Sequence, residues 1–147
     1  MTIGYSLLFD NLVNITEGYE QSRQALRYAL KNMNSSVDCG YEDLGLLRFV
    51  ISEKNKNALI DYCNKLIEPI AIQDQTEHTN YVETLWTFLE NGNNYVKTAQ
   101  VLYVHRNTLV NRIGKIEELL NIDLGNVGVR NTFFNAFTVL KFYGCVE

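Results

Sequence analysis

Residues 101–120, VLYVHRNTLVNRIGKIEELL, most strongly limit what this chain can fold into. They place four apolar residues at helical spacing: Leu109, Ile113, Ile116 and Leu120. At 100° per residue the other three side chains lie within about 40° of Leu109, so the four form one narrow stripe for burial. Most of the remaining side chains of the helix are polar. The segment therefore predicts a helix that packs on one side and offers its other side to a partner.

A second, shorter helical pattern comes just before this one. Asn94 is a good N-cap residue, and Val96, Ala99 and Leu102 would point inward. Two helices that meet steeply across a short turn need a small residue at their contact, and Ala99 supplies it. The spacing predicts a helix-turn-helix with helices at 94–103 and 105–120.

The turn and the start of the second helix carry further expectations. Glycine is usual in this turn, but Tyr103 occupies its place. A positive φ would cost a tyrosine roughly 1 kcal/mol, which favours another turn geometry. With His105 as N-cap, the N–H groups of Arg106 and Asn107 are expected to be free to meet a phosphate.

The polar side of the 105–120 helix has the chemistry of a DNA-reading surface. An asparagine can bond both N6 and N7 of adenine, and a threonine can hydrogen-bond a base or touch a thymine methyl group. Flanking cations can neutralise phosphates or read guanine. The residues predicted on this ground are Arg106, Asn107, Thr108, Asn111, Arg112 and Lys115, with Lys97 as a further phosphate contact.

Length and composition predict the fold class. The chain of 147 residues is long enough for one domain or two small ones. Its one proline, Pro69, is expected to end a helix, and the scarcity of proline favours helices with short connections. We predict a mainly α-helical bundle that contains a helix-turn-helix, with one or two short strands near the N-terminus, where residues 3–9 alternate weakly.

Charge is distributed unevenly along the chain. The net charge is −4, but residues 1–90 hold 7 Lys/Arg and 13 Asp/Glu, whereas residues 91–147 hold 6 and 4. The balances are thus −6 and +2. Because a polyanion responds to local potential, the C-terminal part is the one expected to approach nucleic acid.

Other function classes find little support. No run of 18 apolar residues predicts a membrane span, and the N-terminus lacks the pattern of a signal peptide. Three widely separated cysteines favour reduced thiols over a disulfide framework or a zinc site. No nucleophile–histidine or carboxylate pair can be argued. We therefore predict a cytoplasmic protein that is not an enzyme, with no cofactor, no metal and no membrane partner.

The segment TLWTFLENGNNYVKTAQVLYVHRNTLVNRIGKIEELLNIDL resembles the C-terminal Fis-type helix-turn-helix domain of the PucR/CdaR family of bacterial transcriptional regulators. The resemblance rests on the H-R-N-T-L core, on the N-x-x-x-T-A element, on I-E-E-L-L, and on Arg130 after D-L. The chain departs from the family pattern at Val110 and Gly114. Residues 15–50 resemble, more loosely, the region that precedes this domain.

The resemblance implies a division of the chain. Residues 1–72 would be the tail of a degenerate cyclase-like regulatory domain with linking helices, and residues 73–147 the DNA-binding domain. It implies binding to double-stranded DNA as a homodimer, and a small-molecule effector sensed outside this chain. The family's DNA-facing positions fall here on Thr98, His105, Arg106, Asn107, Thr108 and Arg112.

Two other functions remain open. One is a helical protein–protein interaction module, which would bind DNA weakly and without sequence preference. The other is a small-molecule sensor in residues 1–75, although the sequence has no glycine-rich phosphate loop or metal cluster to support it.

Overall fold

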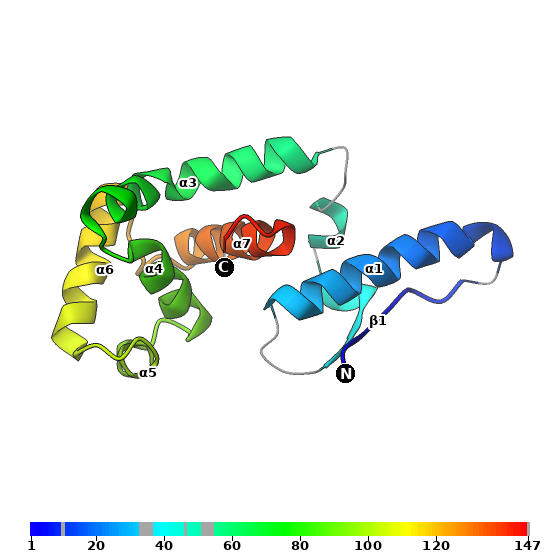
Figure 1. Cartoon of the computed structure of the whole chain (residues 1–147), viewed down its shortest axis with the longest axis horizontal. Helices are drawn as coiled ribbons and strands as arrows, with labels where there is room; N and C mark the ends of the chain where they lie inside the picture. Colours follow the sequence, from blue (N-terminus) through cyan, green and yellow to red (C-terminus); the bar gives the residue numbers. More distant parts are fainter. Residues whose placement is uncertain (10, 33–36, 46, 51–54, 147) are drawn as a thin grey trace. The chain divides into compact units, whose positions relative to one another are not determined.

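The structure is a computed structural model that describes residues 1–9, 11–32, 37–45, 47–50 and 55–146. It is mainly α-helical with a short two-stranded sheet, which confirms the predicted fold class (Figure 1). Its elements in chain order are β1 (Ile3–Tyr5), the 3-10 turn η1 (Leu12–Asn14), α1 (Ile15–Asn32), β2 (Asp38–Gly40), the 3-10 turn η2 (Tyr41–Leu44), α2 (Leu47–Val50), α3 (Lys56–Glu77), α4 (Tyr81–Glu90), α5 (Tyr95–Val101), α6 (Arg106–Leu120) and α7 (Val127–Tyr143). Along these described residues, no helix is both long and apolar enough to cross a membrane.

The chain divides into two compact units. One comprises residues 1–60 together with the C-terminal residues from 138 onward, and the other comprises residues 61–137. The domain boundary predicted after residue 72 falls inside α3, with residues of the second unit on both sides of it. The predicted functional division there stays a prediction.

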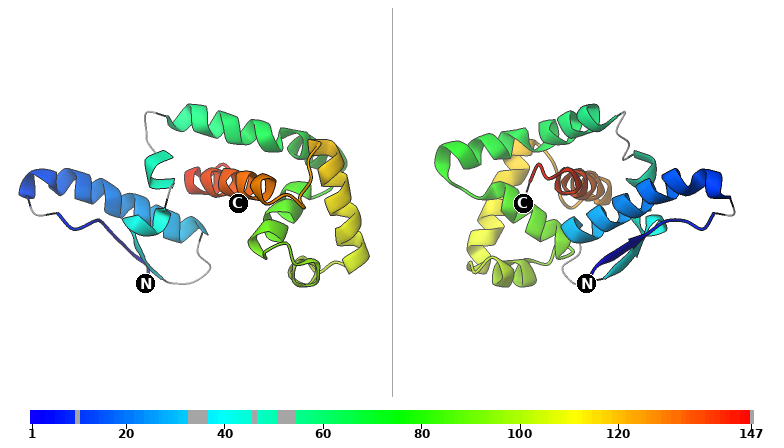
Figure 2. Two further views of the ribbon diagram at one scale, coloured as in Figure 1. Left: turned by 180° about the vertical axis from the view of Figure 1, so that it is seen from behind. Right: turned by 45° about the vertical axis from the view of Figure 1, so that its right-hand side comes forward.

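The first unit is a β-α-β arrangement. β1 pairs in parallel with β2, with Ile3 opposite Asp38, and α1 connects the two strands and packs along them (Figure 2). Gly4 permits the close approach, because a Cβ atom there would lie only 2.4 Å from the backbone of Ser22 and Leu26. The small buried side chains Ala25 and Ala29 continue this tight packing along α1.

The prediction that Pro69 ends a helix is wrong. α3 runs through Pro69 and ends eight residues later at Glu77. A proline inside a helix costs about 3 kcal/mol because it lacks an N–H group and crowds the preceding turn. Here Ile67 and Ile70 on either side of the exposed proline are buried. Burying each isoleucine contributes roughly 1.5–3 kcal/mol, which offsets the cost of continuing the helix.

The core of the second unit forms between α4, α5, α6 and the first part of α7. The Trp86 ring of α4 stacks on Phe134 of α7, with 5.6 Å between ring centroids, and also contacts Phe137. On α6 the buried residues are Leu109, Ile113 and Ile116. The predicted stripe is confirmed at these three positions, while its fourth member, Leu120, is only half-buried at the end of the helix.

One carboxylate joins α3 to α4. Asp74 accepts hydrogen bonds from the Thr79 hydroxyl at 2.6 Å and from the backbone N–H groups of Tyr81 and Val82 at 2.6 and 2.9 Å. His78 and Asn80, in the connection, both have left-handed backbone conformations. Asp74 therefore caps α4 from outside that helix and links the end of α3 to the start of α4.

Candidate nucleic-acid interface

Both ends of α5 are closed by local hydrogen bonds. Asn94 accepts hydrogen bonds from the N–H groups of Val96 and Lys97, both at 3.0 Å, so the predicted N-cap is confirmed. Ala99 is buried, as a small residue at a helix–helix contact should be. Its carbonyl accepts from the Val104 N–H at 3.0 Å and closes the C-terminal end of α5.

Tyr103 adopts the conformation that glycine usually supplies. Its φ is +53°, so the expectation of another turn geometry is wrong. The Tyr103 N–H bonds the Gln100 carbonyl at 3.2 Å, and the left-handed residue allows α6 to leave the turn in a new direction. The chain accepts roughly 1 kcal/mol of local strain to form this turn.

The N-terminus of α6 is capped by His105. Its Nδ1 atom accepts from the Asn107 N–H at 3.2 Å, which confirms the predicted cap. The same bond corrects the expectation that the Asn107 N–H group is free for a phosphate. An imidazole that accepts at Nδ1 carries its proton on Nε2, and that N–H group is available to a partner.

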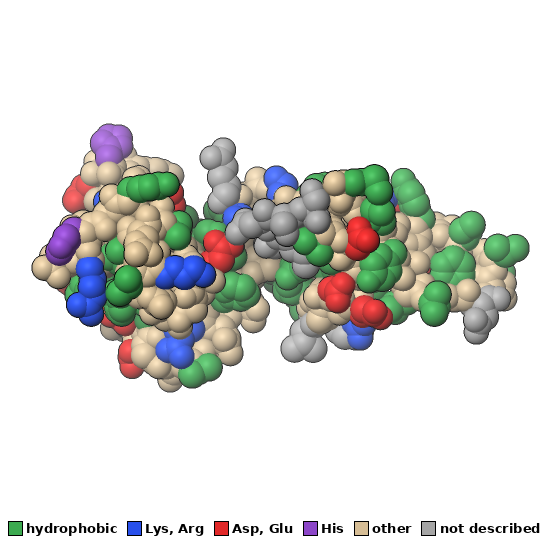
Figure 3. Space-filling view, turned by 90° about the horizontal axis from the view of Figure 1, so that it is seen from below, with side chains coloured by type: hydrophobic (Ala, Val, Ile, Leu, Met, Phe, Trp, Pro, Cys, Tyr) green, Lys and Arg blue, Asp and Glu red, His purple; other side chains and the backbone are tan. Residues whose placement is uncertain are grey.

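The outer face of α6 is polar and open. Asn107, Thr108 and Asn111 are exposed, on the surface away from the buried Leu109. Arg106 is exposed beside them at the start of the helix. At Gly114 an added Cβ would meet no neighbouring atom, so internal packing does not require glycine there. Figure 3 shows lysine and arginine side chains on the surface of this unit.

Local charge favours an anionic partner. Residues 91–116 contain Lys97, Arg106, Arg112 and Lys115 but no aspartate or glutamate. The segment therefore carries four positive charges within a chain whose net charge is −4. Lys97 and Arg106 are exposed, and within the described residues no carboxylate pairs with either.

Thr98 does not belong to this surface. Its side chain is fully buried, with an exposed fraction of 0%, because α5 turns that side toward the core next to Ala99. The resemblance placed Thr98 on the DNA-facing side, and that placement is corrected. Its hydroxyl oxygen has no hydrogen-bond partner among the described residues.

We expect Thr98→Val to raise the free energy of unfolding by about 1 kcal/mol. Valine has the same shape, and it removes a hydroxyl group whose burial is not repaid by a hydrogen bond. Urea denaturation of the full chain measures the change. A loss of stability would mean that the hydroxyl group has a partner such as a buried water, and Thr98→Ser, which keeps the hydroxyl, is the control.

Arg112 and Lys115 are engaged within the protein. Arg112 is half-buried, and its Nη1 atom lies 3.4 Å from the Thr84 hydroxyl oxygen of α4, so this arginine braces α6 against α4. Lys115 forms an ion pair with Glu118 at 2.8 Å. The hydrogen bond that Lys115 donates to Glu118, together with the negative charge of Glu118, raises the pKa of Lys115. Of the predicted cations, Lys97 and Arg106 are thus the most available.

Two charged residues hold the segment that follows α6. Glu117 accepts from the Leu124 N–H at 2.8 Å, and Arg130 donates to the carbonyl oxygens of Leu124 and Gly125 at 2.5 and 2.7 Å. Glu117 is therefore half-buried and engaged with the backbone. Glu117 belongs to the I-E-E-L-L motif and Leu124 to the D-L motif. The sequence shows both motifs, but the spacing between them does not show that the two residues form a hydrogen bond.

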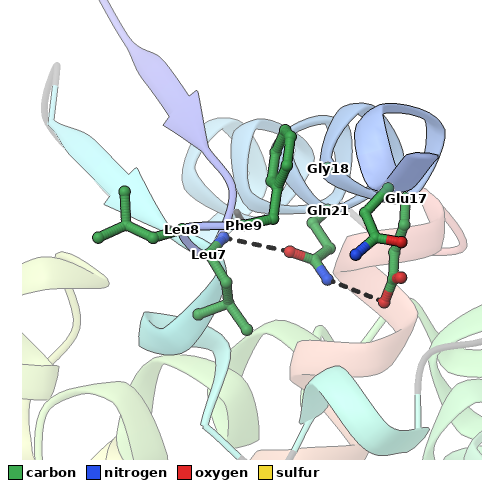
Figure 4. A pocket seen from close by; sticks show the side chains of 7 residues that line it. Leu7, Leu8, Phe9, Glu17, Gly18 and Gln21 are labelled. Atoms are coloured by element: carbon green, nitrogen blue, oxygen red, sulfur yellow. Dashed lines mark hydrogen bonds between the residues drawn. The ribbon is translucent and has the colours of Figure 1, made fainter. Parts of the chain in front are cut away.

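The first unit contains a shallow pocket between the segment after β1 and α1 (Figure 4). Its volume is about 200 Å³, below the roughly 300 Å³ at which small-molecule sites begin. Gln21, on its wall, accepts from the Leu7 N–H at 3.1 Å and donates to Glu17 at 3.3 Å. Because these polar groups already bond one another, the pocket does not favour a sensor in residues 1–75.

The helices that carry the candidate interface resemble those of known proteins. Residues 81–139 match the PucR C-terminal helix-turn-helix domain. The chain is 26% identical over 140 residues to the proline-responsive transcriptional activator PutR of Bacillus subtilis (strain 168), covering 95% of this chain and 34% of PutR. It is 24% identical over 137 residues to the DNA-binding transcriptional activator AdeR of that organism, covering 91% and 32%. It is 28% identical over 127 residues to its purine catabolism regulatory protein, covering 84% and 23%.

The chain therefore spans only about a third or less of the length of these relatives. No solved structure matches it significantly. The match over residues 81–139 and the three regulators confirm the resemblance: the chain carries a helix-turn-helix domain of the PucR type.

Proposed function

We propose that this PucR-type helix-turn-helix domain binds double-stranded DNA and serves as the DNA-binding part of a cytoplasmic transcriptional regulator. One observation carries the proposal. α6 buries Leu109, Ile113 and Ile116 and presents amide and hydroxyl side chains on its open surface, beside an exposed arginine. This is the arrangement that a recognition helix needs in a major groove.

Each part of the motif has a distinct role in this proposal. α5 crosses the DNA backbone, where Lys97 neutralises a phosphate. Arg106 contacts a phosphate or a guanine at the groove, and His105 offers its Nε2–H group nearby. Asn107 and Asn111 meet base edges. Arg112 contributes by holding α6 against α4, through the contact with Thr84.

We propose that the regulator acts as a homodimer under the control of a small-molecule effector. One short helix covers too little DNA for high specific affinity, and two copies on a palindromic site supply the missing contacts. The relative PutR is named for its response to proline. Because the chain spans about a third of PutR, we place effector sensing in a region outside it.

The test is a salt titration of DNA binding by the full chain. The probes are a palindromic duplex selected from a random library and a scrambled duplex of equal length. We expect a slope that reports roughly three to five phosphates per subunit. Arg106→Ala should weaken binding about tenfold and reduce the slope by about one. Asn111→Ala should reduce the preference for the selected duplex and leave the slope unchanged.

Arg23→Ala is the matched control, since it removes one exposed arginine of α1 in the other compact unit. It should leave the slope unchanged. Absence of binding at low salt would overturn the proposal. Weak binding with equal affinity for both duplexes would favour the alternative, a protein–protein interaction module.

We expect Glu118→Gln to strengthen DNA binding roughly three- to tenfold at low salt. Glu118 is exposed on α6 and holds Lys115 in an ion pair, so the substitution removes a repulsive charge and frees a cation. Fluorescence anisotropy with the same duplexes measures the gain. Glu90→Gln, which neutralises an exposed acid at the end of α4, should change affinity much less. Equal effects of both variants would mean that Glu118 acts only through net charge.

A further inference from the structure

Tyr103 stands out among the residues with left-handed backbone. Within the described part of the chain, the other non-glycine residues with positive φ are His78, Asn80, Asn93 and Asn121. Asparagine tolerates this conformation because its short side chain bonds locally, whereas an aromatic side chain has no such compensation. Tyrosine is therefore an unfavourable choice at the turn of the motif.

The protein itself does not use the Tyr103 ring. The exposed fraction of the residue is 95%, so the ring is not buried and its packing does not offset the backbone strain. The Tyr103 N–H bonds the Gln100 carbonyl, a backbone contact that glycine would make equally well. A strained residue with a solvent-exposed aromatic ring suggests a contact made outside the chain.

The position of the turn indicates which contact this is. In a helix-turn-helix the first helix crosses the DNA backbone and the second enters the groove with its N-terminus. The turn between them lies at the edge of the groove, where phosphates are found. Tyr103 precedes Arg106 by three residues, and no carboxylate occurs between Glu90 and Glu117 to repel a phosphate.

We propose that Tyr103 is a DNA-backbone contact, in which its hydroxyl group donates a hydrogen bond to a phosphate oxygen at the edge of the groove. The inference rests on the proposed DNA binding and adds a residue outside the predicted set. A phosphate contact positions the protein without reading sequence. An uncharged donor also displaces no counterion, so it contributes affinity without steepening the salt dependence.

The test compares Tyr103→Phe, Tyr103→Gly and Arg106→Ala in the salt titration described above. Tyr103→Phe removes only the hydroxyl group, and we expect it to weaken binding roughly tenfold on selected and scrambled duplexes alike, with an unchanged slope. Tyr103→Gly should weaken binding at least as much while the melting temperature stays the same or rises. Arg106→Ala should reduce the slope by about one.

Other results of this experiment would contradict either the Tyr103 contact or the proposed DNA binding. If Arg106→Ala behaves as expected but both Tyr103 variants bind like the wild type, the tyrosine contact is overturned and DNA binding stands. Weakening by glycine but not by phenylalanine would overturn the hydroxyl contact. A clear fall in the melting temperature of Tyr103→Gly would overturn the view that the ring packs on nothing within the chain. Failure of the wild type to bind any duplex would overturn the proposed function itself.

Discussion

Replacing Leu109 by alanine should lower the free energy of unfolding by roughly 3–5 kcal/mol, the range for a fully buried leucine whose loss leaves a cavity. Leu109 has an exposed fraction of 0% and lies on the inner side of α6, which packs against both α4 and α5. Losing its side chain therefore weakens the contacts that hold the motif together. Urea denaturation, followed by the fluorescence of Trp86, measures the change, because Trp86 is the only tryptophan and lies in the core of this unit.

The neighbouring residue provides a matched control. Val110 is 42% exposed on the outer side of the same helix, so Val110→Ala should cost less than about 1 kcal/mol. DNA binding by the folded fraction of Leu109→Ala should be weakened as well, since α6 loses its support. Equal destabilisation by the two variants would mean that the inner and outer faces of α6 are assigned wrongly.

Replacing Asp74 by alanine should lower the free energy of unfolding by roughly 2–4 kcal/mol. The carboxylate accepts from the Thr79 hydroxyl and from two backbone N–H groups at the start of α4. Hydrogen bonds to a charged acceptor contribute more than neutral ones, and a negative charge at a helix N-terminus also interacts favourably with the helix dipole. Urea denaturation under the same conditions measures this change.

Glu77→Ala is the control for Asp74→Ala. Glu77 is an exposed acid at the end of the same helix, so its loss should change stability by less than about 0.5 kcal/mol. Asp74→Asn keeps one oxygen acceptor and should fall between the wild type and Asp74→Ala. A stability of Asp74→Ala equal to that of Glu77→Ala would show that the α3–α4 connection does not depend on this carboxylate.

Several features of the site follow from residues that are close together in the sequence. The caps at Asn94 and His105 bond backbone groups two or three residues away. The inner face of α6 follows from the spacing of Leu109, Ile113 and Ile116. Such features depend on local geometry, so the sequence was sufficient to predict them.

Other features depend on residues that are far apart in the sequence. Arg112 contacts Thr84, which lies 28 positions away, and helical spacing does not contain this contact. Pro69 remains inside α3 because the isoleucines on both sides of it are buried, a fact that helix propensity does not contain. In both cases a tertiary interaction outweighs the local preference.

The sequence by itself therefore determined that this protein is mainly helical, where its helix-turn-helix lies and which side of α6 is polar, because helical periodicity and capping act over a few residues. Only the tertiary structure decided which polar side chains remain available to a partner. In the folded protein Thr98 is buried, and Glu117 accepts a hydrogen bond from the Leu124 backbone. Tyr103 is exposed in a strained turn. The reason is physical: burial and hydrogen bonding between elements depend on how helices pack, and a helical pattern does not specify its neighbours.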